Sequence, residues 1–100
     1  MKTDYRKYQR FPVDCDVILS CHSFGMISGN ARDLSLNGVF VTTKFVNLAE
    51  NELVDVCFSV TDNKRKSLHT VGAKVARVSK NGVGLRFIND MPRALYAALN

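Results

Sequence analysis

Apolar side chains occupy every odd position from 13 to 21, and mostly polar side chains lie between them. Successive side chains of a β-strand point to opposite faces, so this period of two indicates a strand with one buried and one solvated face. Cys15 and Cys21 lie at apolar positions of the pattern, where a cysteine behaves as a small core residue. His22 falls on the solvated face. This stretch predicts a β-rich fold in which two of the cysteines are structural.

Similar patterns predict five further strands. Period-two alternation and β-branched or aromatic residues place them at 31–36, 39–43, 54–60, 69–77 and 83–87. On the strand over 69–77, the odd positions from His69 to Arg77 are expected to share one face. Short strands at this spacing are typical of a small antiparallel barrel or sandwich.

The segments between the strands carry turn residues. A hairpin connection is expected over 23–29, around Gly25. Asn37-Gly38 predicts a turn, because both residue types tolerate positive φ. Residues 61–67 have the composition of a solvated hairpin loop with a basic tip.

The period changes after the last strand. Asp90 is a suitable N-cap and Pro92 suits a first turn, which predicts a helix over 93–99. Leu95 and Leu99 are four residues apart and would share one face against the strands. The expected fold class is therefore all-β with a short C-terminal helix.

Size and charge restrict the function. A chain of 100 residues fits one domain and buries only about 60–65% of its unfolded surface, which leaves little room for a deep, water-excluding cleft. The net charge of +5 indicates an anionic partner, although charge alone does not say which one.

The cysteines and the first residues indicate in which cellular compartment the protein is expected. Three cysteines without tight spacing make a poor disulfide framework, and the beginning of the chain lacks the apolar stretch of a secretory signal. No apolar run approaches the ~20 residues of a membrane helix. We expect a cytoplasmic protein with free thiols and no membrane insertion. A zinc site from the Cys and His residues is not expected, since no C-x-x-C or H-x-x-x-H pair is present.

Catalytic motifs are missing from the sequence. Neither His22 nor His69 has an evident nucleophile and orienting acid in its sequence context. No Gly-rich phosphate loop is present, and the glycines of Gly82-Val83-Gly84 precede a strand rather than a helix. We expect no enzymatic activity, no cofactor and no metal.

The first ten residues hold much of the positive charge. They contain four cations and one carboxylate, so they carry +3 of the net +5. Arg6 and Arg10 are four residues apart, and arginine presents a planar fork of donors that suits phosphate oxygens and the O6/N7 edge of guanine. Taken alone, the segment is also compatible with a flexible, solvated basic tail.

A second polar segment is Asp33-Leu34-Ser35-Leu36-Asn37-Gly38. If it is extended, Leu34 and Leu36 point inward and the polar side chains lie on the outer face. A carboxylate accepts hydrogen bonds from the N–H groups of guanine, and a serine hydroxyl can reach a phosphate or a base. Gly38 would permit a sharp turn and a close backbone approach. The alternative is an ordinary Asp-Asn-Gly turn.

Together, R-x-x-x-R over residues 6–10 and D-x-S-x-x-G over 33–38 resemble the paired motif of the PilZ domain family. Further likeness runs through 75–77 and 82–87, so the resemblance covers nearly the whole chain. It implies a bacterial cytoplasmic receptor for cyclic di-GMP, built as a six-stranded antiparallel β-barrel with a C-terminal helix.

The resemblance also implies roles for individual residues. Arg6 and Arg10 match the arginines that clamp guanine and phosphate, Asp33 and Ser35 match the polar residues that read other guanine edges, and Gly38 matches the glycine that shapes the turn. Four further positions are weaker candidates for ligand contact: Tyr5, Lys7, Asn37 and Arg77. Of these, Arg77 would pack on a guanine face.

The expected organisation has three parts within one domain: a mobile basic arm over 1–12, a barrel over 13–90 and a helix over 91–100. Ligand binding would order the arm over the barrel and change the surface offered to a downstream protein. We expect a monomer or a weak dimer. The alternatives are a small basic barrel that binds single-stranded nucleic acid, and a PilZ-like adaptor that binds only proteins. The first is disfavoured because Phe58 and Phe87 fall on buried faces.

Overall fold

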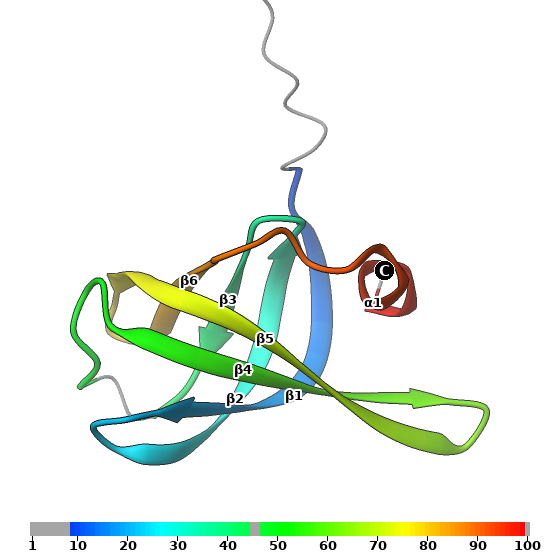
Figure 1. Ribbon diagram of the computed structural model, residues 1–100, viewed down its shortest axis with the longest axis horizontal. Helices are drawn as coiled ribbons and strands as arrows, with labels where there is room; N and C mark the ends of the chain where they lie inside the picture. The colour runs from blue at the N-terminus through cyan, green and yellow to red at the C-terminus, as the bar shows by residue number, and fades with distance from the viewer. Residues whose placement is uncertain (1–8, 45–46, 100) are drawn as a thin grey trace, which may run out of the picture.

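The computed structural model describes residues 9–44 and 47–99, which form a six-stranded antiparallel β-barrel with one short helix (Figure 1). The elements are β1 (Phe11–Cys21), β2 (Gly25–Ser35), β3 (Gly38–Thr42), β4 (Leu53–Asp62), β5 (Arg65–Val78), β6 (Gly82–Phe87) and α1 (Arg93–Leu99). The predicted fold class is confirmed. No helix within the described residues is long and apolar enough to cross a membrane.

The barrel closes in the order β1-β2-β3-β6-β5-β4, with β1 paired to both β2 and β4. Each strand has a hydrogen-bonded neighbour on both sides and so has a defined inner and outer face. Outside the wall, α1 anchors the beginning of β1. The rings of Tyr96 and Phe11 meet edge to face with centroids 5.2 Å apart.

The inward positions of all six strands form one apolar core, as the alternation predicts. Phe58 and Phe87 are both buried and meet edge to face with centroids 6.4 Å apart. Cys15 and Cys21 are buried among these residues, and Leu95 of α1 completes the core from outside the strands. Burying aromatic and aliphatic side chains supplies most of the stabilisation of such a small barrel.

The hairpin between β4 and β5 differs from the prediction. Instead of a loop over 61–67, the strands stay paired through Asp62 and Arg65, and only Asn63 and Lys64 form the turn. Both turn residues have positive φ, 50° and 68°, as a two-residue hairpin turn requires. The hairpin projects beyond the barrel (Figure 1), and every residue from 61 to 70 is exposed. His69 is exposed because its strand face has left the core there.

Candidate functional site

Arg10, the last residue of the R-x-x-x-R motif, lies beside the D-x-S-x-x-G motif at one end of the barrel because of the pairing of β1 with β2. Phe11 lies opposite Leu34, and Pro12 lies opposite Asp33. The exposed Arg10 therefore precedes β1 directly beside the end of β2. The contact between Phe11 and Tyr96 fixes the beginning of β1 against α1. Figure 1 shows the beginning of β1 next to the β2–β3 turn and the segment between β6 and α1.

A β-bulge directs Asp33 to the outer face. Ala31, two residues earlier, is buried and pairs with Val41, whereas Asp33 pairs with Phe40, so Arg32 is an extra residue of β2. A bulge of one residue shifts the side-chain alternation and re-aims the residue that follows. Leu34 consequently points into the core and Asp33 is exposed, as predicted.

A second bulge directs Arg77 to the same face. Val75 pairs with Leu85 inside the barrel, but Arg77 pairs with Gly84, so Ala76 is the extra residue. The prediction that Arg77 shares a face with the buried Val71, Ala73 and Val75 is therefore wrong; Arg77 is exposed. Single-sequence periodicity does not show where a strand has an additional residue.

These residues form one cross-strand row on the outer wall. Asp33 pairs with Phe40, Phe40 with Gly84, and Gly84 with Arg77. A Cβ atom built on Gly84 would lie 3.8 Å from Arg77 Cβ and 4.0 Å from its Nε, so the arginine lies along the glycine. Along the row, the carboxylate is followed by a half-buried aromatic ring, then by the glycine backbone without a side chain, and then by the guanidinium.

The charged groups at this end are available for a ligand. Arg10, Asp33 and Arg77 are exposed, and none of them makes an ion pair or hydrogen bond with another side chain in the described part of the chain. A carboxylate flanked by unpaired guanidinium groups can bind a molecule that carries both phosphates and N–H-rich bases.

The turn after β2 differs from the prediction in three respects. Ser35 is only 1% exposed, so its hydroxyl does not lie open on the outer face. Its Oγ donates to Asn37 Oδ1 at 2.7 Å and accepts from the Asn37 backbone N–H at 3.3 Å. Leu36 is half-buried and outside the core; its carbonyl accepts from the Met91 N–H. Neither Asn37 nor Gly38 has positive φ.

Gly38 is required for close backbone packing rather than for an unusual φ. A Cβ at this position would lie 2.5 Å from the carbonyl oxygen of Leu85 on β6. Since that neighbour is backbone, it cannot rotate away. The predicted close approach is confirmed, and its partner is the facing strand. Beside the turn, the Phe87 N–H donates to the Asn37 carbonyl at 2.8 Å.

Three of the candidate residues, Tyr5, Arg6 and Lys7, lie outside the described residues, and so does most of the arm predicted over 1–12. Conversely, the sequence interpretation missed Phe40. The period of two in the sequence could have identified it. Phe40 lies between the core residues Val39 and Val41, so its side chain must point outward from β3.

The thiols of Cys15 and Cys21 are buried in the core and do not belong to the outer wall. Burial raises the pKa of the Cys15 thiol above its ordinary value. The thiol donates a hydrogen bond to the Ser59 carbonyl at 3.3 Å. Cys57 is half-buried on the outer face of β4. No group of three His, Cys, Asp or Glu side chains that could hold a metal occurs among residues 9–44 and 47–99.

Comparison with known proteins gives the family. The sequence model of the PilZ domain matches residues 4–100. This chain belongs to the PilZ domain family. No curated protein matches it. PilZ domains are ligand-binding or adaptor domains rather than enzymes, and cyclic di-GMP is their typical ligand.

The solved structures that share the fold of this PilZ domain include the following two. One is the Bacillus subtilis inhibitor of motility (MotI/DgrA), with a TM-score of 0.74 and 16% identity over 99% of this chain. The chain spans only 50% of that protein's length. The other is the PilZ domain of CeSA from a cellulose-synthesizing bacterium, with a TM-score of 0.66, 15% identity and 90% of each chain covered.

Proposed function

We propose that this PilZ domain is a cytoplasmic receptor for cyclic di-GMP. The observation that carries the proposal is the pairing of Pro12 with Asp33, which brings Arg10, the last residue of the R-x-x-x-R motif, beside D-x-S-x-x-G. Each motif alone has an ordinary explanation, as a basic tail or as a turn. The position of Arg10 beside Asp33 on one exposed surface does not follow from either explanation.

The chemistry of the ligand fits this surface. Cyclic di-GMP carries two phosphates and two guanines, so it needs guanidinium forks, a carboxylate acceptor and a surface on which a base can stack. Arg6 and Arg10 would bind guanine edges and phosphates, and Asp33 would accept from guanine N–H groups. Arg77, lying along Gly84, would pack on a guanine face.

The remaining residues of the D-x-S-x-x-G motif would shape the turn beside the ligand. Ser35 is buried, so its proposed role is to hold the turn together with Asn37 rather than to contact the ligand by an open hydroxyl. Gly38 lets β3 approach β6 closely at the same place. Tyr5 and Lys7 remain proposed contacts from the segment that precedes Arg10.

Phe11 and Pro12 of the arm predicted over 1–12 already belong to β1. Binding would order the part of the arm that precedes β1 against the barrel wall and alter the surface that a partner protein meets. The domain would act as a monomer or a weak dimer, without nucleic acid, cofactor or metal.

Calorimetry with cyclic di-GMP tests the proposal. We expect the wild type to bind and Arg10→Ala to bind about 10- to 100-fold more weakly, because charge-assisted hydrogen bonds contribute about 1.5–3 kcal/mol. Arg65→Ala is the matched control, since Arg65 is an equally exposed arginine on the distant β4–β5 hairpin. It should leave the affinity unchanged.

Other results of these binding measurements would contradict the proposal or favour one of the alternatives. No heat from the wild type would contradict the receptor function and favour the adaptor alternative. Unchanged affinity in Arg10→Ala would exclude only the role given to that arginine. Binding to single-stranded DNA or RNA with a steep salt dependence, and without a response to cyclic di-GMP, would favour the nucleic-acid alternative.

A further inference from the structure

Exposed apolar side chains gather on a part of the barrel that the candidate site does not use. The described residues include five large apolar side chains with high exposure, and three of them, Met26, Leu53 and Ile88, line one open hollow. Their exposed fractions are 75%, 60% and 58%. Scattered apolar residues are normal on a surface, but a contiguous group marks a contact site.

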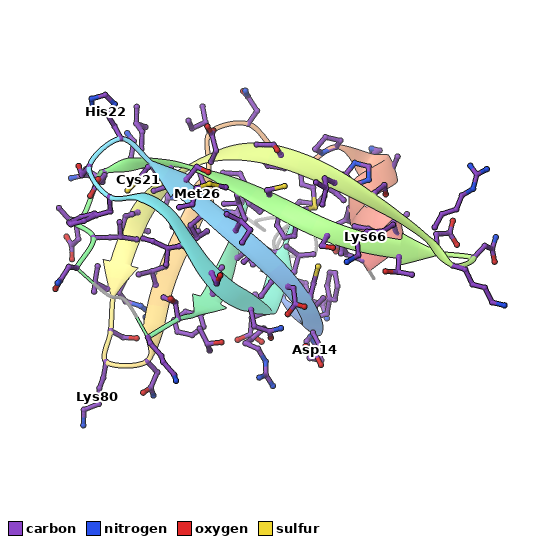
Figure 2. All side chains as sticks on the ribbon, turned by 90° about the horizontal axis from the view of Figure 1, so that it is seen from below. Asp14, Cys21, His22, Met26, Lys66 and Lys80 are labelled. Atoms are coloured by element: carbon purple, nitrogen blue, oxygen red, sulfur yellow. The ribbon has the colours of Figure 1, made fainter. Side chains whose placement is uncertain are left out.

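The strand register brings these residues together from distant parts of the chain. Met26 pairs with Ser20, Ser20 with Asp55, and Asp55 with Gly72, which forms one outward row across β2, β1, β4 and β5. Figure 2 shows Met26 near Cys21 and His22 at the β1–β2 turn, far from Lys66 on the β4–β5 hairpin.

Ile88 closes the opposite side of this hollow. Its backbone N–H donates to the Gly72 carbonyl at 3.0 Å, and its Cδ1 would lie 3.5 Å from a Cβ on Gly72. The side chain of Ile88 therefore lies close over Gly72. Hydrogen bonding fixes the backbone of Ile88, yet its side chain stays exposed to solvent.

Two cations lie beside the apolar group. Lys74 on β5 and Arg86 on β6 are direct cross-strand partners, and Lys74 is also paired with Leu53. Together with Ile88 they line a second hollow that adjoins the first. Like charges directly opposite each other destabilise a sheet. Neither side chain makes a hydrogen bond or an ion pair with a residue of the described ranges.

We propose that these two hollows form a docking surface for a segment of a partner protein that carries an apolar anchor flanked by carboxylates. The apolar side chain would fill the space between Met26, Leu53 and Ile88, and the carboxylates would pair with Lys74 and Arg86. A carboxylate between these cations removes their mutual repulsion, which makes the charge pattern favourable only in the complex. None of these residues belongs to the proposed nucleotide site.

Two other occupants fit the surface less well. A second copy of the chain would bring together two molecules of net charge +5. An anionic membrane would present a broad surface to a concave hollow. A protein segment with one inserted side chain suits both the hollow shape and the position of the cations.

Peptide titration of the full 15N-labelled chain tests the proposal without cyclic di-GMP. The probes are synthetic peptides of about twelve residues with a central Leu, Ile or Phe and three nearby Glu residues. A matched set has Lys in place of Glu. We expect at least one acidic peptide to shift the amide resonances of Met26, Leu53 and Ile88, and the basic set to leave them unchanged.

Variants locate the binding surface. Leu53→Ser should weaken the binding of the acidic peptide about tenfold, and Lys74→Glu should abolish it, since interface anchors dominate affinity. Leu68→Ser and Lys66→Glu on the β4–β5 hairpin are matched controls, because Leu68 is 67% exposed and lies outside both hollows. Circular dichroism checks that every variant is folded.

Several results would overturn the docking surface. They are the absence of binding by any acidic peptide, equal binding by the basic set, and resonance shifts outside the two hollows. Self-association in ultracentrifugation that is lost in Leu53→Ser would assign the surface to a second copy. Binding to phosphatidylglycerol vesicles that is lost in the same variant would assign it to a membrane. A failure of cyclic di-GMP binding would leave this proposal unaffected.

Discussion

Asp33 and Arg77 each follow a β-bulge. Without the bulges, strict alternation would point both side chains into the core, and with them both point outward from the barrel wall. The extra residues are Arg32 on β2 and Ala76 on β5. Because of them, a carboxylate and a guanidinium lie in one cross-strand row with Phe40 and Gly84 between them. Bulges next to binding sites commonly have this re-aiming role.

Replacing Arg77 should affect binding without affecting stability. Arg77→Ala is expected to weaken the affinity for cyclic di-GMP about tenfold, because the guanidinium would no longer pack on a base. The free energy of unfolding should change by less than about 0.5 kcal/mol, since the side chain is exposed and makes no ion pair with a described residue. Calorimetry and urea unfolding measure the two quantities. An unchanged affinity would remove Arg77 from the site.

Ser35→Ala should destabilise the domain. The buried hydroxyl bonds to both the side chain and the backbone N–H of Asn37, so its loss leaves two polar groups of the turn without their partner. We expect the free energy of unfolding to fall by about 1–3 kcal/mol. Urea unfolding followed by circular dichroism measures this loss.

The control for Ser35 is Ser67→Ala. Ser67 also uses its hydroxyl, at 3.0 Å from His69 Nε2, but it is exposed on the β4–β5 hairpin. Water can replace that hydrogen bond, so the stability should be nearly unchanged. Equal stability of Ser35→Ala and the wild type would show that the turn holds without the hydroxyl.

Gly38→Ala and Gly84→Ala should differ sharply. A Cβ at Gly38 would meet the Leu85 carbonyl oxygen at 2.5 Å, whereas a Cβ at Gly84 has its nearest neighbour at 3.8 Å. We expect Gly38→Ala to lower the free energy of unfolding by about 1–3 kcal/mol, because β3 and β6 must separate. Gly84→Ala should be tolerated. Thermal unfolding of both variants gives the comparison, and similar melting temperatures would contradict it.

Glu52 should contribute to the acid sensitivity of the domain. The backbone N–H of Ala49 donates to Glu52 Oε1 at 3.1 Å and holds the pKa of this carboxyl below its ordinary value, with smaller contributions from Ser23 and Cys21. A pKa lowered in the folded state stabilises the protein above the ordinary carboxyl pKa, and this stabilisation is lost as the pH falls through the folded-state value.

The melting temperature should therefore depend less on pH in Glu52→Gln than in the wild type, over the acidic range. Glu50→Gln is the control, because Glu50 is exposed and makes no hydrogen bond with a described residue. Differential scanning calorimetry from neutral to acidic pH measures the effect. Parallel pH profiles for the wild type and Glu52→Gln would exclude this contribution.

Much of the fold could be predicted from the sequence, because a strand with one buried face has apolar residues at every second position. The alternation over 13–21 placed Cys15 and Cys21 in the core, and the change of period placed the helix after Asp90. The hairpin at 61–67 was wrongly predicted as a loop, because polar composition does not distinguish a solvated loop from a paired ribbon that has left the core.

The candidate site was likewise predictable from the sequence only in part. The identities of Arg10, Asp33 and Gly38 and their spacing are properties of the sequence alone, and they sufficed for the resemblance to PilZ domains. The tertiary structure decided that Ser35 is buried and that Arg77 faces outward. Bulges and barrel closure depend on pairing between distant strands, and local periodicity carries no record of that pairing.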